Sequence, residues 1–292
     1  MNPLPNNFSW PLARKLAGYA AQAYDRADIT DVATDAAAIV TLDENDDIVV
    51  AFRGSRAARD FVQDAKVRLW EVRSTEFEVR SAVSEKIHEG FFQDFEAIDL
   101  AVTSNVKTLL AVRPASRVWL TGHSLGGALA ILCAYQFARQ QLPVAGVYTF
   151  GQPRVGNATF AAAYDSAAIV AQASRVRVYA ASRRVSPAPA GSGSETLPEP
   201  AAGTAALRDL TFRVVNQNDL VPRLPGWLTG YRHCGQEIFL RPDDRAEANP
   251  TFMEKLMWDA LGLYGAYRKR EDVLIREHLL GAYQAQMQKE EV

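Results

Sequence analysis

The chain has 292 residues, of which 48% are hydrophobic and 23% charged, a balance typical of a globular protein with a full core. Its 32 basic and 34 acidic side chains leave a net charge of −2, which argues against nucleic acid or an anionic membrane as a partner. Two cysteines, Cys133 and Cys234, are too few for a disulfide framework, and four histidines without paired ligand spacing argue against a zinc site.

The amino-terminal residues lack the basic start and the apolar segment of a signal peptide. The longest apolar runs are shorter than a membrane span, so we expect no transmembrane segment. These features predict a cytoplasmic protein, unless an upstream leader has been removed. The oligomeric state is left open.

The first elements are predicted to be a helix and a β-hairpin. Residues 11–24 carry apolar side chains at helical spacing, which is typical of a helix packed on a domain. Residues 38–42 and 48–52 are apolar runs separated by an acidic turn, and this pattern predicts two paired strands. The second strand leads into a polar loop at 53–55, which the residues alone do not distinguish from an ordinary turn.

Residues 56–70 mix charged side chains with aromatic and aliphatic ones, so they are interpreted either as a lid over a site or as a solvated helix face. A helix is predicted at 93–112. His88, just before it, is expected to be a packing residue because hydrolases of the α/β type place their base after the nucleophile.

The most informative stretch is residues 117–140. An apolar run at 118–120 predicts a buried strand, and an alanine- and leucine-rich stretch after Gly126 predicts a helix. Between them, Gly-His-Ser-Leu-Gly at 122–126 fits the nucleophile elbow, in which the flanking glycines avoid collision with the neighbouring strand and helix. Ser124 is therefore the candidate nucleophile, and the alternative is a glycine-rich turn without chemistry.

The second half of the chain is predicted to add strands to the same sheet at 144–150, 212–215 and 238–240, as well as a strand at 176–179 and a helix at 251–267. The loop at 151–157 should lie at the edge of the sheet that carries Ser124, as a wall of a pocket. Residues 183–207 are rich in Pro, Gly, Ser and Ala and are interpreted as a flexible insertion. Because a further strand follows this insertion, we expect one domain over residues 1–292 rather than two joined by a linker.

Asp219 follows the strand at 212–215 and precedes two prolines that stiffen the loop, which is where a triad carboxylate belongs. The alternative is a carboxylate in an ordinary turn. Two histidines, His233 and His278, follow Asp219 in the order that a Ser-Asp-His triad requires. We favour His278 as the base, because His233 immediately precedes a strand that must still enter the sheet.

Several longer motifs occur together in one order. They are the elbow, Phe52-Arg-Gly-Ser55, His88-x-Gly-Phe91, Gly151-x-Pro-Arg-Val-Gly-Asn157, Asn218-Asp-x-Val-Pro-Arg-Leu-Pro225 and Tyr231-x-His233. With them the chain resembles the class 3 lipases, which implies an α/β-hydrolase fold with a mostly parallel central sheet flanked by helices. It departs from the family pattern in a longer segment at 158–210 and in a region without a clear counterpart at 241–270.

The resemblance implies a carboxylester hydrolase, foremost a triacylglycerol lipase, that needs no cofactor and acts through an acyl-enzyme. It implies that Ser124 is the nucleophile, Asp219 the acid and His278, followed closely by the aromatic Tyr283, the base. The backbone N–H groups of Ser55 and Leu125 would form the oxyanion hole. His233 matches a histidine of the family that is not catalytic.

Three alternatives stay open at this stage. A phospholipase A1 or a feruloyl-type esterase would use the same catalytic parts with a different acyl pocket. An inactive hydrolase fold would serve as a binding protein. For the enzymes we expect an ester or glyceride substrate at a lipid–water interface, with either residues 56–70 or the 183–207 insertion covering the site.

Overall fold

The structure is a computed structural model of the chain. It describes residues 2–55, 74–76, 85–170, 204–217, 219–241, 243, 245–251, 253–255 and 278–289. The predicted lid at 56–70 and the predicted strand at 176–179 lie outside the described residues, as does most of the predicted helix at 251–267.

The helices and strands follow one another in an alternating order typical of α/β proteins. In chain order they are α1 (Trp10–Asp25), β1 (Ile29–Thr30), β2 (Ala37–Leu42), β3 (Ile48–Phe52), β4 (Ser74–Glu76), β5 (Lys86–His88), α3 (Glu89–Val112), β6 (Val118–His123), α4 (Leu125–Arg139), β7 (Gly146–Phe150), β8 (Gly156–Asn157), α5 (Ala158–Ser166), β9 (Ala168–Val170), β10 (Thr204–Ala206), α6 (Leu207–Leu210), β11 (Thr211–Asn216), the 3₁₀ turns η1 (Val221–Arg223) and η2 (Trp227–Thr229), β12 (Tyr231–Arg232), β13 (Gln236–Leu240), β14 (Ala246–Ala248) and α9 (Leu280–Gln288).

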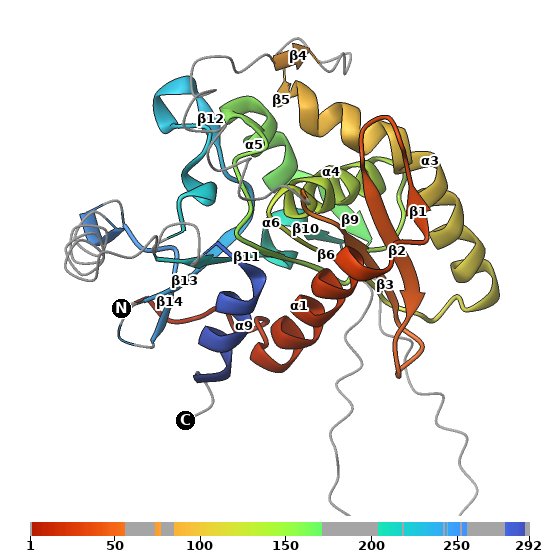
Figure 1. Ribbon diagram of the computed structural model, residues 1–292, viewed down its shortest axis with the longest axis horizontal. Helices are drawn as coiled ribbons and strands as arrows, with labels where there is room; N and C mark the ends of the chain where they lie inside the picture. Colours follow the sequence, from red (N-terminus) through yellow and green to blue (C-terminus); the bar gives the residue numbers. More distant parts are fainter. Residues whose placement is uncertain are drawn as a thin grey trace, which may run out of the picture.

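The described strands form a main sheet in the order β1-β2-β3-β6-β7-β11-β13-β14 (Figure 1). The five central strands, β3, β6, β7, β11 and β13, run parallel to one another. Strands β1, β2 and β14 complete the two sides in antiparallel pairing, and β2 with β3 is the predicted hairpin. Because the central strands are parallel, their last residues meet at one edge, here called the carboxyl edge, and their first residues at the amino edge.

Helices cover both faces of the sheet, and the alternation of side chains along β6 explains why. Val118 and Leu120 point into a core shared with α3, α4 and α5, whereas Trp119 points into a second core shared with α1 and α9. Both faces are thus apolar, which is what a central parallel strand requires. Figure 1 shows α1 and α9 next to each other, as their contacts also indicate.

Helix α1 confirms the prediction for residues 11–24. Its alanines and Leu16 face the core, and the side chain of Ser9 accepts a hydrogen bond from the Leu12 N–H at the helix start. Helix α3 starts four residues earlier than predicted. It does so because Phe91 already packs in the core, and the ring of His88 stacks on it with 4.2 Å between centroids, in agreement with a packing role.

The predicted insertion at 183–207 is too long at its carboxyl end. Residues 204–206 are strand β10, which pairs with β9, and Leu207 is buried in the core at the start of α6. Burial of the apolar Leu207 side chain favours ordered structure at this end of the segment, although the residues before it have the composition of a loop. Strand β10 ends only a few residues before the first residue of β11, which is at the amino edge of the sheet. The carboxyl end of the predicted insertion therefore lies toward the amino edge, away from Ser124. None of the described helices is long and apolar enough to cross a membrane.

Candidate active site

Ser124 lies in a tight bend between β6 and α4. Its backbone has φ +56° and ψ −126°, a conformation that L-residues rarely adopt and that costs on the order of 1–3 kcal/mol. A Cβ at Gly122 would lie 2.2 Å from the Gly126 carbonyl oxygen, and one at Gly126 would lie 2.2 Å from the Phe52 carbonyl oxygen. The predicted reason for both glycines is confirmed, since one meets helix α4 and the other strand β3.

The bend brings Ser124 together with the two residues predicted to act with it. The His278 Nε2 is 2.9 Å from the Ser124 Oγ, and the His278 Nδ1 is 2.8 Å from the Asp219 Oδ2. The three come from the end of β6, the loop after β11 and the turn before α9, and each is at most 1% exposed. This order of contacts is that of a Ser-His-Asp triad.

Asp219 accepts hydrogen bonds from a backbone N–H, from a tyrosine hydroxyl and from the His278 imidazole. Its Oδ1 accepts from the Val221 N–H at 2.8 Å, and its Oδ2 accepts from the Tyr283 hydroxyl at 2.6 Å as well as from His278. The Tyr283 oxygen in turn accepts from the Asn216 N–H at 3.1 Å. Both carboxylate oxygens are therefore fixed, and Nδ1 of His278 must carry the proton in that hydrogen bond.

His233 is directed elsewhere. Its Nε2 donates to the Pro222 carbonyl at 2.7 Å, so this ring supports the loop that bears Asp219. Burial, and then the charges of Arg213 and Arg154, hold the pKa of His233 well below its ordinary value. Of the two histidines that sequence order allowed, the structure brings His278 to Ser124.

Arg154, in the loop after β7, also donates hydrogen bonds to the loop that bears Asp219. The Arg154 N–H donates to the Leu224 carbonyl, and its Nη1 donates to the carbonyls of Arg223 and Pro225. Burial, and then the neighbouring Arg213, lower the pKa of Arg154 to about 10, so the guanidinium stays charged at neutral pH. A charged donor on several carbonyls is a strong clamp on this loop.

Gly151 lies directly against the pair of Asp219 and His278. Its φ is +60°, and a Cβ there would lie 2.8 Å from the Asp219 Oδ2 and 3.1 Å from the His278 Nδ1. Gly151, Gln152 and Pro153 are all buried. The loop predicted as a pocket wall thus begins with three buried residues, of which Gly151 packs against Asp219 and His278.

His123, next to Ser124, has contacts that sequence reasoning missed. Its Nδ1 is 2.9 Å from the Tyr24 hydroxyl, and its Nε2 is 2.6 Å from the backbone carbonyl of His278. Burial, and then the charge of His278, lower the pKa of His123 to about 3, so its ring is neutral at working pH. The sequence indicated only that Tyr24 belongs to the apolar side of its helix.

The two predicted oxyanion donors lie at the carboxyl edge. Leu125 is the first residue of α4, where backbone N–H groups have no partner within the helix and the helix dipole is positive. Ser55 follows β3, after Gly54. A Cβ at Gly54 would lie 2.1 Å from the Tyr24 Oη and 2.7 Å from the His123 carbonyl oxygen, so this loop packs closely on the elbow.

Among the residues that the structure describes, no group of His, Cys, Asp and Glu side chains could hold a metal ion. Cys133 and Cys234 are both buried free thiols. Burial raises the pKa of each thiol, which keeps it protonated and unreactive.

The sequence model of the family described as lipase (class 3) matches residues 49–229, more than half of the chain. A lipase of Rhizomucor miehei is 26% identical over 205 residues, which are 68% of this chain and 43% of that protein. A secreted mono- and diacylglycerol lipase of Penicillium cyclopium is 27% identical over 229 residues, 78% of this chain and 59% of that protein. The chain thus spans about half the length of these relatives.

Solved structures with the same fold include the triacylglyceride lipase of Rhizomucor miehei. It has a TM-score of 0.58 and 22% identity, with 81% of this chain and 80% of that chain covered. A triacylglycerol lipase whose catalytic centre is described as a serine protease triad has a TM-score of 0.58 and 22% identity, with 82% of each chain covered. These likenesses confirm the predicted α/β-hydrolase fold. The Penicillium relative is described as secreted, so the comparisons give no support to the cytoplasmic location expected above.

Proposed function

The chain belongs to the class 3 lipase family, and from this premise we propose that it is a serine carboxylester hydrolase acting on glycerides. One observation carries the proposal: the Ser124 Oγ, on a strained bend, lies 2.9 Å from an imidazole whose other nitrogen is 2.8 Å from a buried carboxylate. The fold neighbour described with a serine protease triad supports the same chemistry.

In the proposed reaction Ser124 attacks the ester carbonyl while the His278 Nε2 takes its proton as general base. Because Asp219 holds the proton on the Nδ1, the Nε2 lone pair faces the serine hydroxyl. The imidazolium that forms is stabilised by the Asp219 carboxylate and then returns its proton to the leaving alcohol. Water, activated by the same imidazole, hydrolyses the acyl-enzyme.

We assign the stabilisation of the negative charge that develops on the ester carbonyl oxygen to the backbone N–H groups of Ser55 and Leu125. The amino end of α4 adds its dipole at the same place. In other enzymes a single oxyanion donor contributes about 3 kcal/mol to the transition state. Both proposed donors are backbone groups, so substitution of either side chain leaves the N–H in place.

The relatives are a lipase and a mono- and diacylglycerol lipase, and we extend glyceride hydrolysis at a lipid–water interface to this chain. Triacylglycerol is the proposed substrate. A series of p-nitrophenyl esters and glycerides of rising chain length, with a phospholipid and a feruloyl ester in the same panel, tests this choice. Turnover confined to phospholipid or to the feruloyl ester would contradict it.

The nucleophile is tested by a fluorophosphonate probe. The wild-type chain should be labelled at Ser124, and Ser124→Ala should not be labelled. An unlabelled wild-type protein with an intact fold would contradict the proposal and favour an inactive binding protein.

The base is tested by two alanine variants assayed on a p-nitrophenyl ester. His278→Ala should abolish hydrolysis, whereas His233→Ala should retain substantial turnover, because His233 only supports a loop through the Pro222 carbonyl. The reverse ranking would overturn the assignment. Circular dichroism of both variants should show that the fold is retained.

A further inference from the structure

We propose that His123 and Tyr24 are positioning residues for this reaction, and that together they set His278 and the loop of Ser55 in register with Ser124. The inference rests on the proposed function, because it deepens the account of the same site. Neither residue touches the reacting atoms in this arrangement.

The first step concerns the backbone of His278. Its ring contacts Asp219 and Ser124, but a ring stays in place only if its backbone does. The His123 Nε2 lies 2.6 Å from the His278 carbonyl oxygen, and the two rings are 4.7 Å apart between centroids. Since His123 is the residue before Ser124, this hydrogen bond ties the base directly to the elbow across 155 positions of sequence.

The second step is the direction of the hydrogen bonds. A carbonyl oxygen only accepts, so the His123 Nε2 carries the proton and donates. The neutral ring then presents a lone pair at Nδ1, and the Tyr24 hydroxyl, 2.9 Å away, donates to it. The Tyr24 oxygen itself lies against Gly54, where a Cβ would be 2.1 Å from it.

These bonds form one chain, from the Tyr24 hydroxyl through the His123 ring to the carbonyl of His278. Burial raises the pKa of Tyr24 to about 12 and lowers that of His123 to about 3. Both links are therefore neutral over the whole pH range in which an esterase works. Because the Tyr24 hydroxyl and the His123 ring are neutral, they can hold the backbone of His278 without an ionic interaction with the Asp219 carboxylate.

The third step is steric. A Cβ on Gly54 would lie 2.1 Å from the Tyr24 Oη, so the hydroxyl fills the space against this loop. Ser55, a proposed oxyanion donor, is the next residue. The chain of bonds therefore starts beside Ser55, the proposed oxyanion donor, and ends on His278, the proposed base. Ser124, the proposed nucleophile, directly follows His123 in the middle of this chain. A misplacement of about 1 Å at a reacting centre costs about 10²-fold in rate. The relative positions of Ser55, Ser124 and His278 should therefore affect kcat.

The test separates the hydroxyl of Tyr24 from its bulk. Tyr24→Phe keeps the ring and removes the hydrogen bond to the His123 Nδ1. Its matched control is Tyr135→Phe on α4, which removes a hydrogen bond of 3.0 Å to the Glu85 Oε2 outside the site. On a soluble p-nitrophenyl ester, Tyr24→Phe should lower kcat about tenfold with KM within twofold of wild type, and the control should leave both unchanged.

The donor of His123 is tested by two variants. His123→Gln keeps an N–H group that can reach the His278 carbonyl, and His123→Met fills similar space without one. The glutamine variant should retain at least tenfold more kcat than the methionine variant at equal melting temperature. Equal kcat in the two variants, or a Tyr24→Phe variant as active as its control, would overturn the inference.

A second readout does not need activity. The chain has four histidines, so nitrogen-15 histidine NMR gives a separable signal for each ring. The wild type should show His123 as the Nε2–H tautomer, and Tyr24→Phe should shift the signals of His123 and His278 while those of His88 and His233 stay in place. Unchanged His278 signals would overturn the inference. Should the wild type lack hydrolase activity, the proposed function would fail while these signals still decide whether Tyr24 and His123 position His278.

Discussion

The two edges of the central sheet each hold buried carboxylates, but the groups around them differ. At the amino edge, Asp47, the residue before β3, is paired with Arg117, the residue before β6. At the carboxyl edge, Asp219 accepts from His278, from Tyr283 and from a backbone N–H. One carboxylate is paired with an arginine, and the other is held by an imidazole, a hydroxyl and a backbone N–H.

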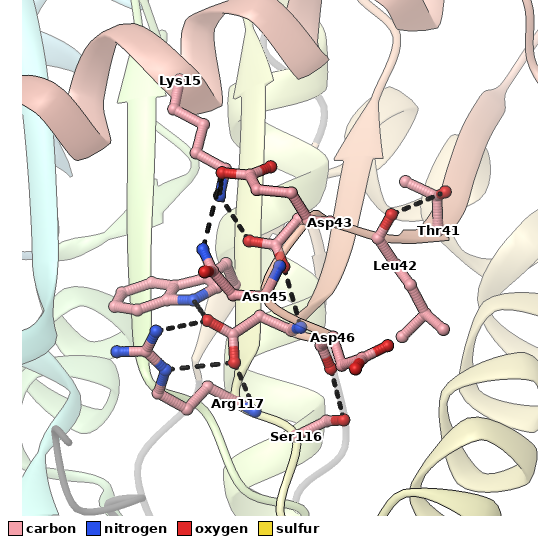
Figure 2. A network of polar contacts seen from close by, with 11 residues as sticks. Lys15, Thr41, Leu42, Asp43, Asn45, Asp46, Ser116 and Arg117 are labelled. Carbon is pink, nitrogen blue, oxygen red and sulfur yellow. Dashed lines mark hydrogen bonds and ion pairs between the residues drawn. The ribbon is translucent and has the colours of Figure 1, made fainter. Parts of the chain in front are cut away.

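The amino-edge network joins three elements. Asp47 accepts from the Arg117 Nε at 3.1 Å and from the Trp119 Nε1 at 3.3 Å, and the Arg117 guanidinium lies over the Trp119 ring. Asp43 accepts from Lys15 of α1, and the Ser116 hydroxyl donates to the Asp46 carbonyl (Figure 2). The hairpin turn is thereby fastened to α1 and to β6.

The difference shows what makes a buried acid structural or available for chemistry. The carboxylate of Asp47 is balanced by the positive charge of the Arg117 guanidinium, to which it is hydrogen-bonded directly. Asp219 has no such partner among the described residues, so in the proposed reaction its charge is left to stabilise the imidazolium of His278. Substitutions at the two edges should therefore change different quantities.

The largest effect is expected for Asp219→Asn. The amide cannot hold the His278 Nδ1–H as the carboxylate does, so the ring loses its working tautomer, and kcat should fall by roughly 10⁴-fold. The measurement is kcat on a soluble ester, with the unfolding midpoint in urea recorded alongside. A fall of less than about tenfold in kcat would remove Asp219 from the proposed triad.

Gly151→Ala should have the next largest effect. The added methyl would lie 2.8 Å from the Asp219 Oδ2 at a backbone φ of +60°, so it should displace the Asp219–His278 pair and lower kcat by about 10²-fold. Gly281→Ala on α9 is the control, because a Cβ there meets nothing within 4 Å. Equal kcat in the two variants would contradict the close packing of Gly151.

At the amino edge, Asp47→Asn should change stability and not catalysis. The loss of the carboxylate leaves the Arg117 guanidinium without its charged acceptor, which should lower the free energy of unfolding by about 1–3 kcal/mol. Asp46→Asn, at a neighbouring side chain that is 74% exposed, should change it by less than about 0.5 kcal/mol. Urea unfolding measures both, and kcat should stay within twofold of wild type.

The smallest effect concerns pH and Asp43. Burial acts to raise the pKa of this carboxyl, but hydrogen bonds from Lys15 and from the N–H groups of Asp47 and Asn45 outweigh it, and the pKa is lowered from 3.8. A lowered pKa in the folded state gives stability that is present above pH 3.8 and is lost as the pH falls through the folded value.

In Asp43→Asn the loss of stability relative to wild type should therefore be largest at pH 7 and should shrink below about pH 4. Urea unfolding at pH 7, 4 and 3 measures the difference, with Asp28→Asn at an exposed position as control. A difference that is the same at all three pH values would show that the ionised carboxylate of Asp43 contributes nothing.

Much of the fold could be predicted because its signals are local. The apolar runs of β3, β6, β7, β11 and β13 are short and β-rich, and each is followed by turn residues. The ends of elements were less predictable: Leu207 reads as part of a loop, yet it is buried, because its environment is made by helix and strand residues far away in sequence.

By itself the sequence determined the elbow, the strand before it, the helix after it and the order of Ser124, Asp219 and His278. It could do so because two glycines at fixed spacing encode a bend whose clashes lie within a few residues. Only the tertiary structure decided that His278 and not His233 reaches Ser124, that Gly151 packs against Asp219 and His278, and that the His123 ring lies between Tyr24 and the His278 carbonyl. The Tyr24–His123, His123–His278 and Ser124–His278 contacts join residues 99 to 155 positions apart, and their geometry depends on how α1, α4 and α9 pack on the sheet.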